Sequence, residues 1–113
     1  MVKEYFVNKK LNKEFGVELI QANKNCIDKY RKYVRGNRED KDYICLMKLN
    51  RNYILGKKIF ESREYIIKAY GNLRIKYNKE ENMLVDMYNE KGLNRSFNIN
   101  NTTKERLNKI MKI

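Results

Sequence analysis

Residues 73–88, which read LRIKYNKEENMLVDMY, decide the fold class of this chain. From Leu73 to Tyr77 apolar residues alternate with basic ones, a period of two that is typical of a strand with one buried face. A polar segment, residues 78–82, separates this run from a second apolar run at 83–88. The stretch therefore predicts a β-hairpin whose strands cover residues 73–77 and 83–88.

Two amphipathic segments lie on either side of this hairpin in the sequence. In residues 17–35 apolar side chains recur at spacings of three and four, which predicts a helix that ends before Gly36. Residues 102–112 show the same helical spacing near the C-terminus. Thr102 or Thr103 is the expected N-cap of this last helix.

The middle of the chain is less regular. Residues 62–70 predict a short helix, with Ser62 as its N-cap and a glycine directly after its end. Residues 43–49 form a short apolar run that favours a buried strand, although periodicity alone leaves a helix open. Residues 53–60 either pair with that run as a hairpin or continue a helix that begins near Leu49.

The elements together predict one small α+β domain. No proline and no glycine- or serine-rich linker interrupts the chain, so we expect residues 1–113 to form a single domain. Residues 96–99 are a candidate for one further short strand. In this domain the helices pack with a short antiparallel β-hairpin or sheet.

The charge of the chain points to a polyanionic partner. The sequence has 26 Lys and Arg residues against 14 Asp and Glu residues, a formal net charge of +12. A balance this basic favours nucleic acid as the partner. An AT-rich genome would also raise the Lys and Asn counts, but it does not explain the eight Arg residues.

The sequence lacks the residues that common catalytic and metal sites need. It has no His, and no two glycines are closer than 15 residues, so it has no glycine-rich phosphate loop. Glu39, Asp40 and Asp42 share one loop with basic residues, which favours a solvated turn over a metal site. Cys26 and Cys45 lie in apolar runs and are expected to be buried, unlinked thiols. We therefore expect neither catalysis, a cofactor nor a metal.

Hydropathy gives an expectation for the compartment. No apolar stretch approaches the ~20 residues of a membrane span, and the N-terminus has no signal-peptide pattern. We therefore expect a cytoplasmic protein that has no membrane partner.

The predicted order of elements resembles that of winged helix-turn-helix DNA-binding proteins of plasmids and phages. The matching segments are a helix, a short strand, two helices and a hairpin, at residues 17–35, 43–47, 49–58, 62–71 and 73–88. Gly56 falls where this family has a small residue that lets two helices cross. Phe60 and Glu61 depart from the family's turn, which usually has a glycine followed by an apolar residue.

The resemblance implies a sequence-specific, double-stranded DNA-binding protein that acts as a homodimer in partition, transfer or regulation of a mobile element. Residues 62–71 would enter the major groove. Contacts to bases or phosphates would then come from Arg63, Lys68 and Asn72. The wing would contribute Lys76, Asn78 and Lys79. The DNA backbone would be held by Arg31, Lys32, Arg35 and Arg38.

Two other functions remain open. A sheet can bind RNA or single strands by stacking bases on aromatic rings, for which the sequence offers Tyr53, Tyr77, Tyr88 and Phe97. A mobile-element protein can also inhibit a host nucleic-acid enzyme by direct contact. The basic charge argues against mimicry of DNA but not against other modes of inhibition.

Overall fold

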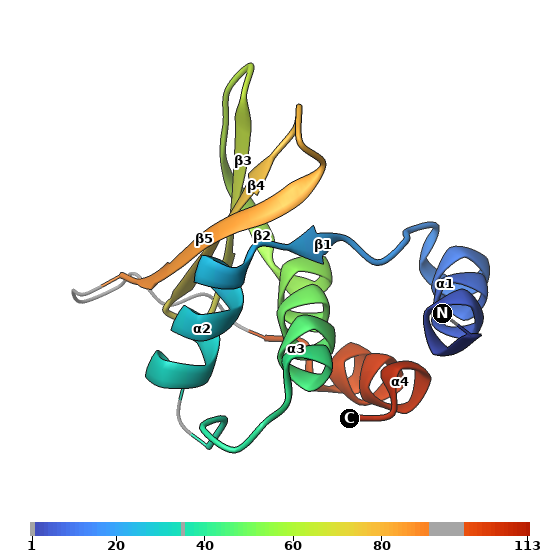
Figure 1. Cartoon of the computed structure of the whole chain (residues 1–113). Coiled ribbons are helices and arrows are strands. Elements are labelled where there is room, and N and C mark those ends of the chain that lie inside the picture. Colours follow the sequence, from blue (N-terminus) through green and yellow to red (C-terminus); the bar gives the residue numbers. More distant parts are fainter. Residues whose placement is uncertain (1, 35, 91–98) are drawn as a thin grey trace.

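The computed structural model describes residues 2–34, 36–90 and 99–113 (Figure 1). Within these ranges the chain forms an α+β domain with four helices and five strands. In chain order these are α1 (Val2–Phe15), β1 (Gln21–Ala22), α2 (Lys24–Tyr33), α3 (Asp42–Leu55), β2 (Lys57–Glu61), β3 (Tyr65–Tyr70), β4 (Leu73–Asn78), β5 (Met83–Asn89) and α4 (Asn101–Met111).

The strands form one mixed sheet with the order β1-β5-β4-β3-β2. Strands β2 to β5 are an antiparallel meander, whereas β1 runs parallel to β5 and pairs Gln21 with Met83. The hairpin predicted from residues 73–88 is confirmed as β4 and β5, with Ile75 opposite Met87. Figure 1 shows the ends of the β2–β3 and β4–β5 hairpins projecting away from the helices.

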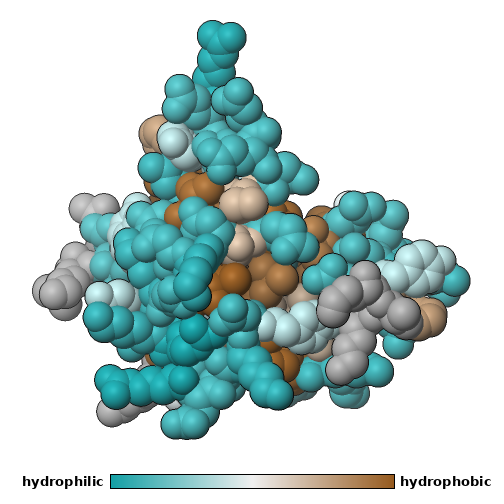
Figure 2. All heavy atoms as spheres, viewed as in Figure 1, coloured by the Kyte–Doolittle hydropathy of each residue, from teal (hydrophilic) through white to brown (hydrophobic). Residues whose placement is uncertain are grey.

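Helices α2 and α3 cover one face of the sheet. Their buried side chains meet those of β4 and β5 in one core, formed by Cys26, Tyr30, Cys45, Leu49, Tyr53, Leu73, Ile75, Leu84 and Met87. Both cysteines are buried and free, which confirms the expectation for the thiols. Figure 2 shows apolar atoms where α2 and α3 meet the sheet, and polar side chains over most of the remaining surface.

A second apolar cluster joins α1, α3 and α4 through Val7, Leu11, Leu46, Met47, Leu107, Ile110 and Met111. Helix α3 thus contributes to two cores on opposite sides. This explains why residues 43–49 are apolar without a clear helical period, and the strand favoured there is wrong. Among the described residues, no helix is both long and apolar enough to cross a membrane.

The predicted helix at 17–35 begins only at Lys24. Asn23 is its N-cap, and the Asn23 Oδ1 accepts a hydrogen bond from the Cys26 N–H at 2.8 Å. The preceding residues are extended and are tied to α3 by Asn50, which is 1% exposed. Asn50 Oδ1 accepts from the Ile20 N–H at 2.7 Å, and Asn50 Nδ2 donates to the Ile20 carbonyl at 2.9 Å.

The predicted helix at 62–70 is also wrong, because this segment forms strand β3. Ser62 does not cap a helix; its Oγ accepts from the Tyr65 N–H at 3.1 Å in the tight turn between β2 and β3. Strand β3 is an inner strand of the sheet and pairs with β2 on one side and β4 on the other. This pairing, together with the β-branched and aromatic residues of the segment, makes the strand more stable than the predicted helix.

Residues 53–60, for which a hairpin strand and the end of a helix were both considered, form part of each. The helix continues to Leu55, and strand β2 starts two residues later. Gly56 lies between them, where an added Cβ would approach the Lys68 Cβ to 3.0 Å and the Ala69 carbonyl oxygen to 3.2 Å. The small residue is therefore needed for contact between the end of α3 and strand β3, and not for a crossing of two helices.

A helix lies near each end of the chain. Residues 2–15, for which no element was predicted, form α1. The last helix is confirmed as α4, although its N-cap is Asn100, whose Oδ1 accepts from the Thr103 N–H at 3.0 Å. The short strand considered at 96–99 falls largely outside the described residues.

Candidate nucleic-acid interface

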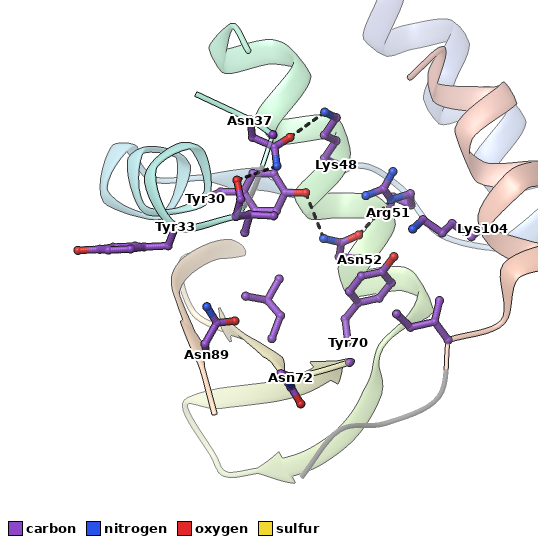
Figure 3. Close-up of a pocket in the computed structure, with 15 residues that line it drawn as sticks. Tyr30, Tyr33, Asn37, Lys48, Arg51, Asn52, Tyr70, Asn72, Asn89 and Lys104 are labelled. Atoms are coloured by element: carbon purple, nitrogen blue, oxygen red, sulfur yellow. Dashed lines mark hydrogen bonds between the residues drawn. The ribbon is translucent and has the colours of Figure 1, made fainter. Parts of the chain in front are cut away.

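A cavity of about 530 Å³ lies between α2, α3, the β3–β4 turn and the start of α4 (Figure 3). Its lining includes three tyrosines, Tyr30, Tyr33 and Tyr70, and four asparagines, Asn37, Asn52, Asn72 and Asn89. Three cationic side chains also line it: Lys48, Arg51 and Lys104. None of the described lining residues carries a carboxylate.

Arg51 carries a positive charge that no carboxylate neutralises within the part of the chain described. Its Nε donates to Asn52 Oδ1 and its Nη1 donates to Asn108 Oδ1, both at 3.0 Å. Both acceptors are neutral amides, so they orient the guanidinium without cancelling its charge. Asn52 is 2% exposed, which makes it a rigid support for this orientation.

The two lysines of the cavity differ in their partners. Lys48 Nζ forms an ion pair with Asp40 at 2.6 Å and donates to Asn37 Oδ1 at 2.7 Å, so its charge is already compensated. Lys104 Nζ lies 5.7 Å from the centroid of the Tyr70 ring, and no ion pair joins it to another described residue. Arg51 and Lys104 therefore supply the uncompensated positive charge of the cavity.

The three tyrosines occupy different depths. Tyr30 is 1% exposed, its Oη accepts from Asn52 Nδ2 at 3.4 Å, and burial raises its pKa. The Tyr70 Oη is buried and has no hydrogen-bond partner among the described residues. Tyr33 lies at the rim with 57% of its surface exposed. Figure 3 shows the hydroxyl end of Tyr70 directed toward Arg51 and Lys104, whereas Tyr33 lies on the other side of the cavity.

A second hollow adjoins the cavity and shares Tyr33, Val34 and Gly36 with it. Its lining adds Glu39 and two of the residues expected to hold a nucleic-acid backbone, Lys32 and Arg38. The sequence therefore indicated the flank of the cavity, although not the cavity itself.

The other two members of that predicted group are placed differently. Arg31 forms ion pairs with Asp28, at 3.1 Å, and with Asp42, and its Nε donates to the Asp40 carbonyl at 2.9 Å. These contacts leave its charge compensated. Arg35 lies outside the described residues. Asp40 and Asp42 of this loop thus act in ion pairs, and no group of three or more potential ligands among the described residues is placed to hold a metal.

Comparison with known proteins gives no family for this chain: it matches no protein-family model, no curated protein and no solved structure.

The residues predicted for the reading helix do not form one surface. Arg63 lies in the exposed β2–β3 turn. Lys68 lies on the helix-covered face of β3, with its Nζ 4.4 Å from the centroid of the Tyr53 ring, and burial lowers its pKa. Asn72, in the β3–β4 turn, is the member of this group that lines the cavity. Because residues 62–71 form a strand, the groove-entering geometry expected for them is absent.

The predicted wing residues lie on β4 and its turn. Lys76 Nζ stands 3.9 Å from the centroid of the Tyr65 ring. Asn78 Oδ1 accepts from the Glu81 N–H at 2.8 Å, and Lys79 forms an ion pair with Glu61 at 2.6 Å. The hairpin ends, residues 57–64 and 78–82, contain four basic and four acidic residues. Their charges balance, so these ends offer little attraction to phosphates.

Two of the four aromatic rings proposed for stacking on the sheet pack against each other instead. Tyr53 and Tyr77 pack against each other with their ring centroids 5.8 Å apart, on the face that the helices cover. Tyr88 is 38% exposed, and Phe97 lies outside the described residues. Stacking platforms are therefore better sought at the cavity, where Tyr33 is more exposed.

Sequence reasoning missed Arg51, Lys104 and Tyr70 as site residues. One signal was present: Arg51 lies between two asparagines in a helix whose other residues are apolar apart from Asp42 and Lys48. Buried amides need partners, and an arginine held by them is oriented for a purpose other than solubility. No comparable pattern marked Lys104, which approaches the cavity only through the tertiary packing of α4 against α3.

Proposed function

We propose that this protein binds single-stranded nucleic acid and seats one unstacked nucleotide in the cavity. The observation that carries the proposal is the lining itself, in which uncompensated Arg51 and Lys104 face tyrosine rings and amides without any carboxylate among the described residues. Such a lining suits a ligand that is both anionic and aromatic. A nucleotide combines these two properties in one unit.

The adjoining hollow supports a strand longer than one nucleotide. Two cations, Lys32 and Arg38, line this hollow together with Tyr33 and one carboxylate residue, Glu39, so its lining is basic on balance. A nucleic-acid backbone that passes over Tyr33 would thus meet cations in both hollows. The formal charge of +12 adds a long-range attraction that does not depend on sequence.

The geometry favours a single strand over a duplex. A volume of about 530 Å³ lies within the ~300–1,000 Å³ range of small-ligand sites, which suits one nucleotide whose base has left its stack. In a duplex the bases stay paired and stacked inside the double helix, so they cannot enter the cavity. The segment that was expected to form the DNA-reading helix is the β-strand β3. The hairpin ends that project from the domain carry equal numbers of basic and acidic residues. We therefore favour single-strand binding over sequence-specific duplex binding.

Fluorescence anisotropy tests the proposal with labelled 12-nucleotide strands of RNA and DNA and the matching duplexes. We expect a single strand to bind at least ~10-fold more tightly than its duplex, and the RNA and DNA arms identify the preferred sugar. If Arg51, Lys104, Lys32 and Arg38 each neutralise one phosphate, single-strand affinity falls about 50-fold between 50 and 200 mM salt.

A pair of variants locates the binding. Lys104→Gln should weaken single-strand binding, whereas Lys109→Gln, which removes the same charge from an exposed position of α4, should change it little. Tighter binding of the duplex, or binding that is indifferent to salt, would contradict the proposal.

A further inference from the structure

We infer that the cavity binds the phosphorylated end of a strand, with a phosphate monoester held by Arg51, Lys104 and the Tyr70 hydroxyl. The inference rests on the proposed single-strand binding and names the part of the strand that enters the cavity. Three separate elements, α3, α4 and β3, bring these three donors to one side of it.

The Arg51 guanidinium is held by the protein in an orientation that suits an anion. The hydrogen bonds from Nε and Nη1 to Asn52 and Asn108 fix the plane of the guanidinium and leave Nη2 to a ligand. A guanidinium fixed in this way loses little conformational entropy when it binds an oxyanion. Arginine also matches the spacing of phosphate oxygens through its planar set of donors.

Tyr70 provides an observation that packing alone does not explain. Its hydroxyl is buried without a hydrogen-bond partner among the described residues, an arrangement that destabilises a folded protein. A phenylalanine would fill the same space without this penalty. The hydroxyl is directed toward the two uncompensated cations, where an oxyanion would accept its hydrogen bond.

Lys104 completes the site. Its ammonium lies beside the Tyr70 ring, and it belongs to the first turn of α4. The N-terminus of a helix carries a partial positive charge that further favours an anion at this place. The cavity therefore combines two full positive charges with one neutral donor at the same side.

This set of donors fits a monoester better than the diester within a strand. A phosphate monoester carries about −1.5 to −2 charges at pH 7 and presents three terminal oxygens. A diester carries a single charge and presents two free oxygens. Two uncompensated cations and three donors match the monoester in both charge and number.

The test compares three single strands of one sequence: one with a 5′-phosphate, one with a 3′-phosphate and one with hydroxyls at both ends. We expect one phosphorylated strand to bind about 10- to 30-fold more tightly than the strand without a terminal phosphate. The two phosphorylated strands show which end enters. Lys104→Gln should remove this preference, whereas Lys109→Gln should retain it.

Tyr70→Phe separates a ligand-binding role from a structural one. We expect the preference for the phosphorylated strand to fall about 5- to 10-fold, binding of the unphosphorylated strand to stay within twofold, and the melting temperature not to fall. An unchanged preference in Tyr70→Phe would overturn the role of the hydroxyl in the site.

The outcomes distinguish the two proposals. If all three strands bind the wild-type protein equally well, the terminal-phosphate inference is wrong while single-strand binding stands. If none of the strands binds, the proposed function fails and the inference fails with it.

Discussion

Replacing Tyr33 by alanine tests the stacking platform at the rim of the cavity. Tyr33 is 57% exposed, and among the described residues the Lys32 ammonium lies over its ring, 5.4 Å from the centroid. More than half of the residue is therefore open to a stacking base. Stacking on an aromatic residue contributes about 1–3 kcal/mol per base, so Tyr33→Ala should weaken single-strand binding about 5- to 150-fold. The same exposure limits the cost in folding stability to about 1 kcal/mol or less.

The control for this variant is Tyr5→Ala. Tyr5 is 63% exposed on α1 and contacts Phe6, with their ring centroids 5.5 Å apart, but it does not line the cavity. Anisotropy titrations with a labelled single strand should show a loss for Tyr33→Ala, little change for Tyr5→Ala, and near wild-type affinity for Tyr33→Phe. Equal losses in the two alanine variants, or no loss in either, would refute the stacking argument.

Three further predictions concern the fold. Asn50→Ala should lower the free energy of unfolding by about 2–4 kcal/mol in urea titrations, because it leaves both backbone groups of Ile20 without partners. Hydrogen bonds from two lysines lower the pKa of Glu61 to about 2, so the stability from this carboxylate is present above pH ~4.5 and is lost as the pH falls toward 2. Acid titration of Glu61→Gln should therefore show a smaller loss than wild type. Burial raises the pKa of the Cys26 thiol to about 12 and also raises that of Cys45. A thiol reagent should label neither in the native protein and both after denaturation without reductant.

The sequence predicted the parts of this fold whose pattern is local. The helix near the C-terminus is confirmed, and its period follows from one buried face with Leu107, Ile110 and Met111. The hairpin at 73–88 is also confirmed by the alternation in residues 73–77, although Arg74, between Leu73 and Ile75, is buried as well. Residues 43–49 lack such a period because α3 is buried on two sides, by the sheet and by α1 with α4. Residues 62–70 were compatible with a helix, and pairing with two neighbouring strands decided against it.

For the candidate site, too, the sequence predicted what is local and missed what depends on tertiary packing. Lys32 and Arg38 belong to a basic run that is visible in the sequence, and they flank the cavity. The cavity itself is built from residues far apart in the chain, such as Tyr33, Arg51 and Lys104. Charge compensation was equally invisible, because the partners of Arg31 depend on how the loop before α3 folds. Composition indicated a polyanionic partner, but only the tertiary structure shows which cations remain uncompensated.

Photo-crosslinking tests the central claim, that a single strand occupies the cavity, most directly. A single strand that carries 5-iodouracil is irradiated with the protein, and mass spectrometry then locates the attached residue. The account predicts attachment at Tyr33 or Tyr70, with competition by an unlabelled single strand but not by a duplex. Phe60 on β2 and Tyr88 on β5 are 50% and 38% exposed. Attachment at either residue would contradict the account and place the nucleic acid on the β-sheet.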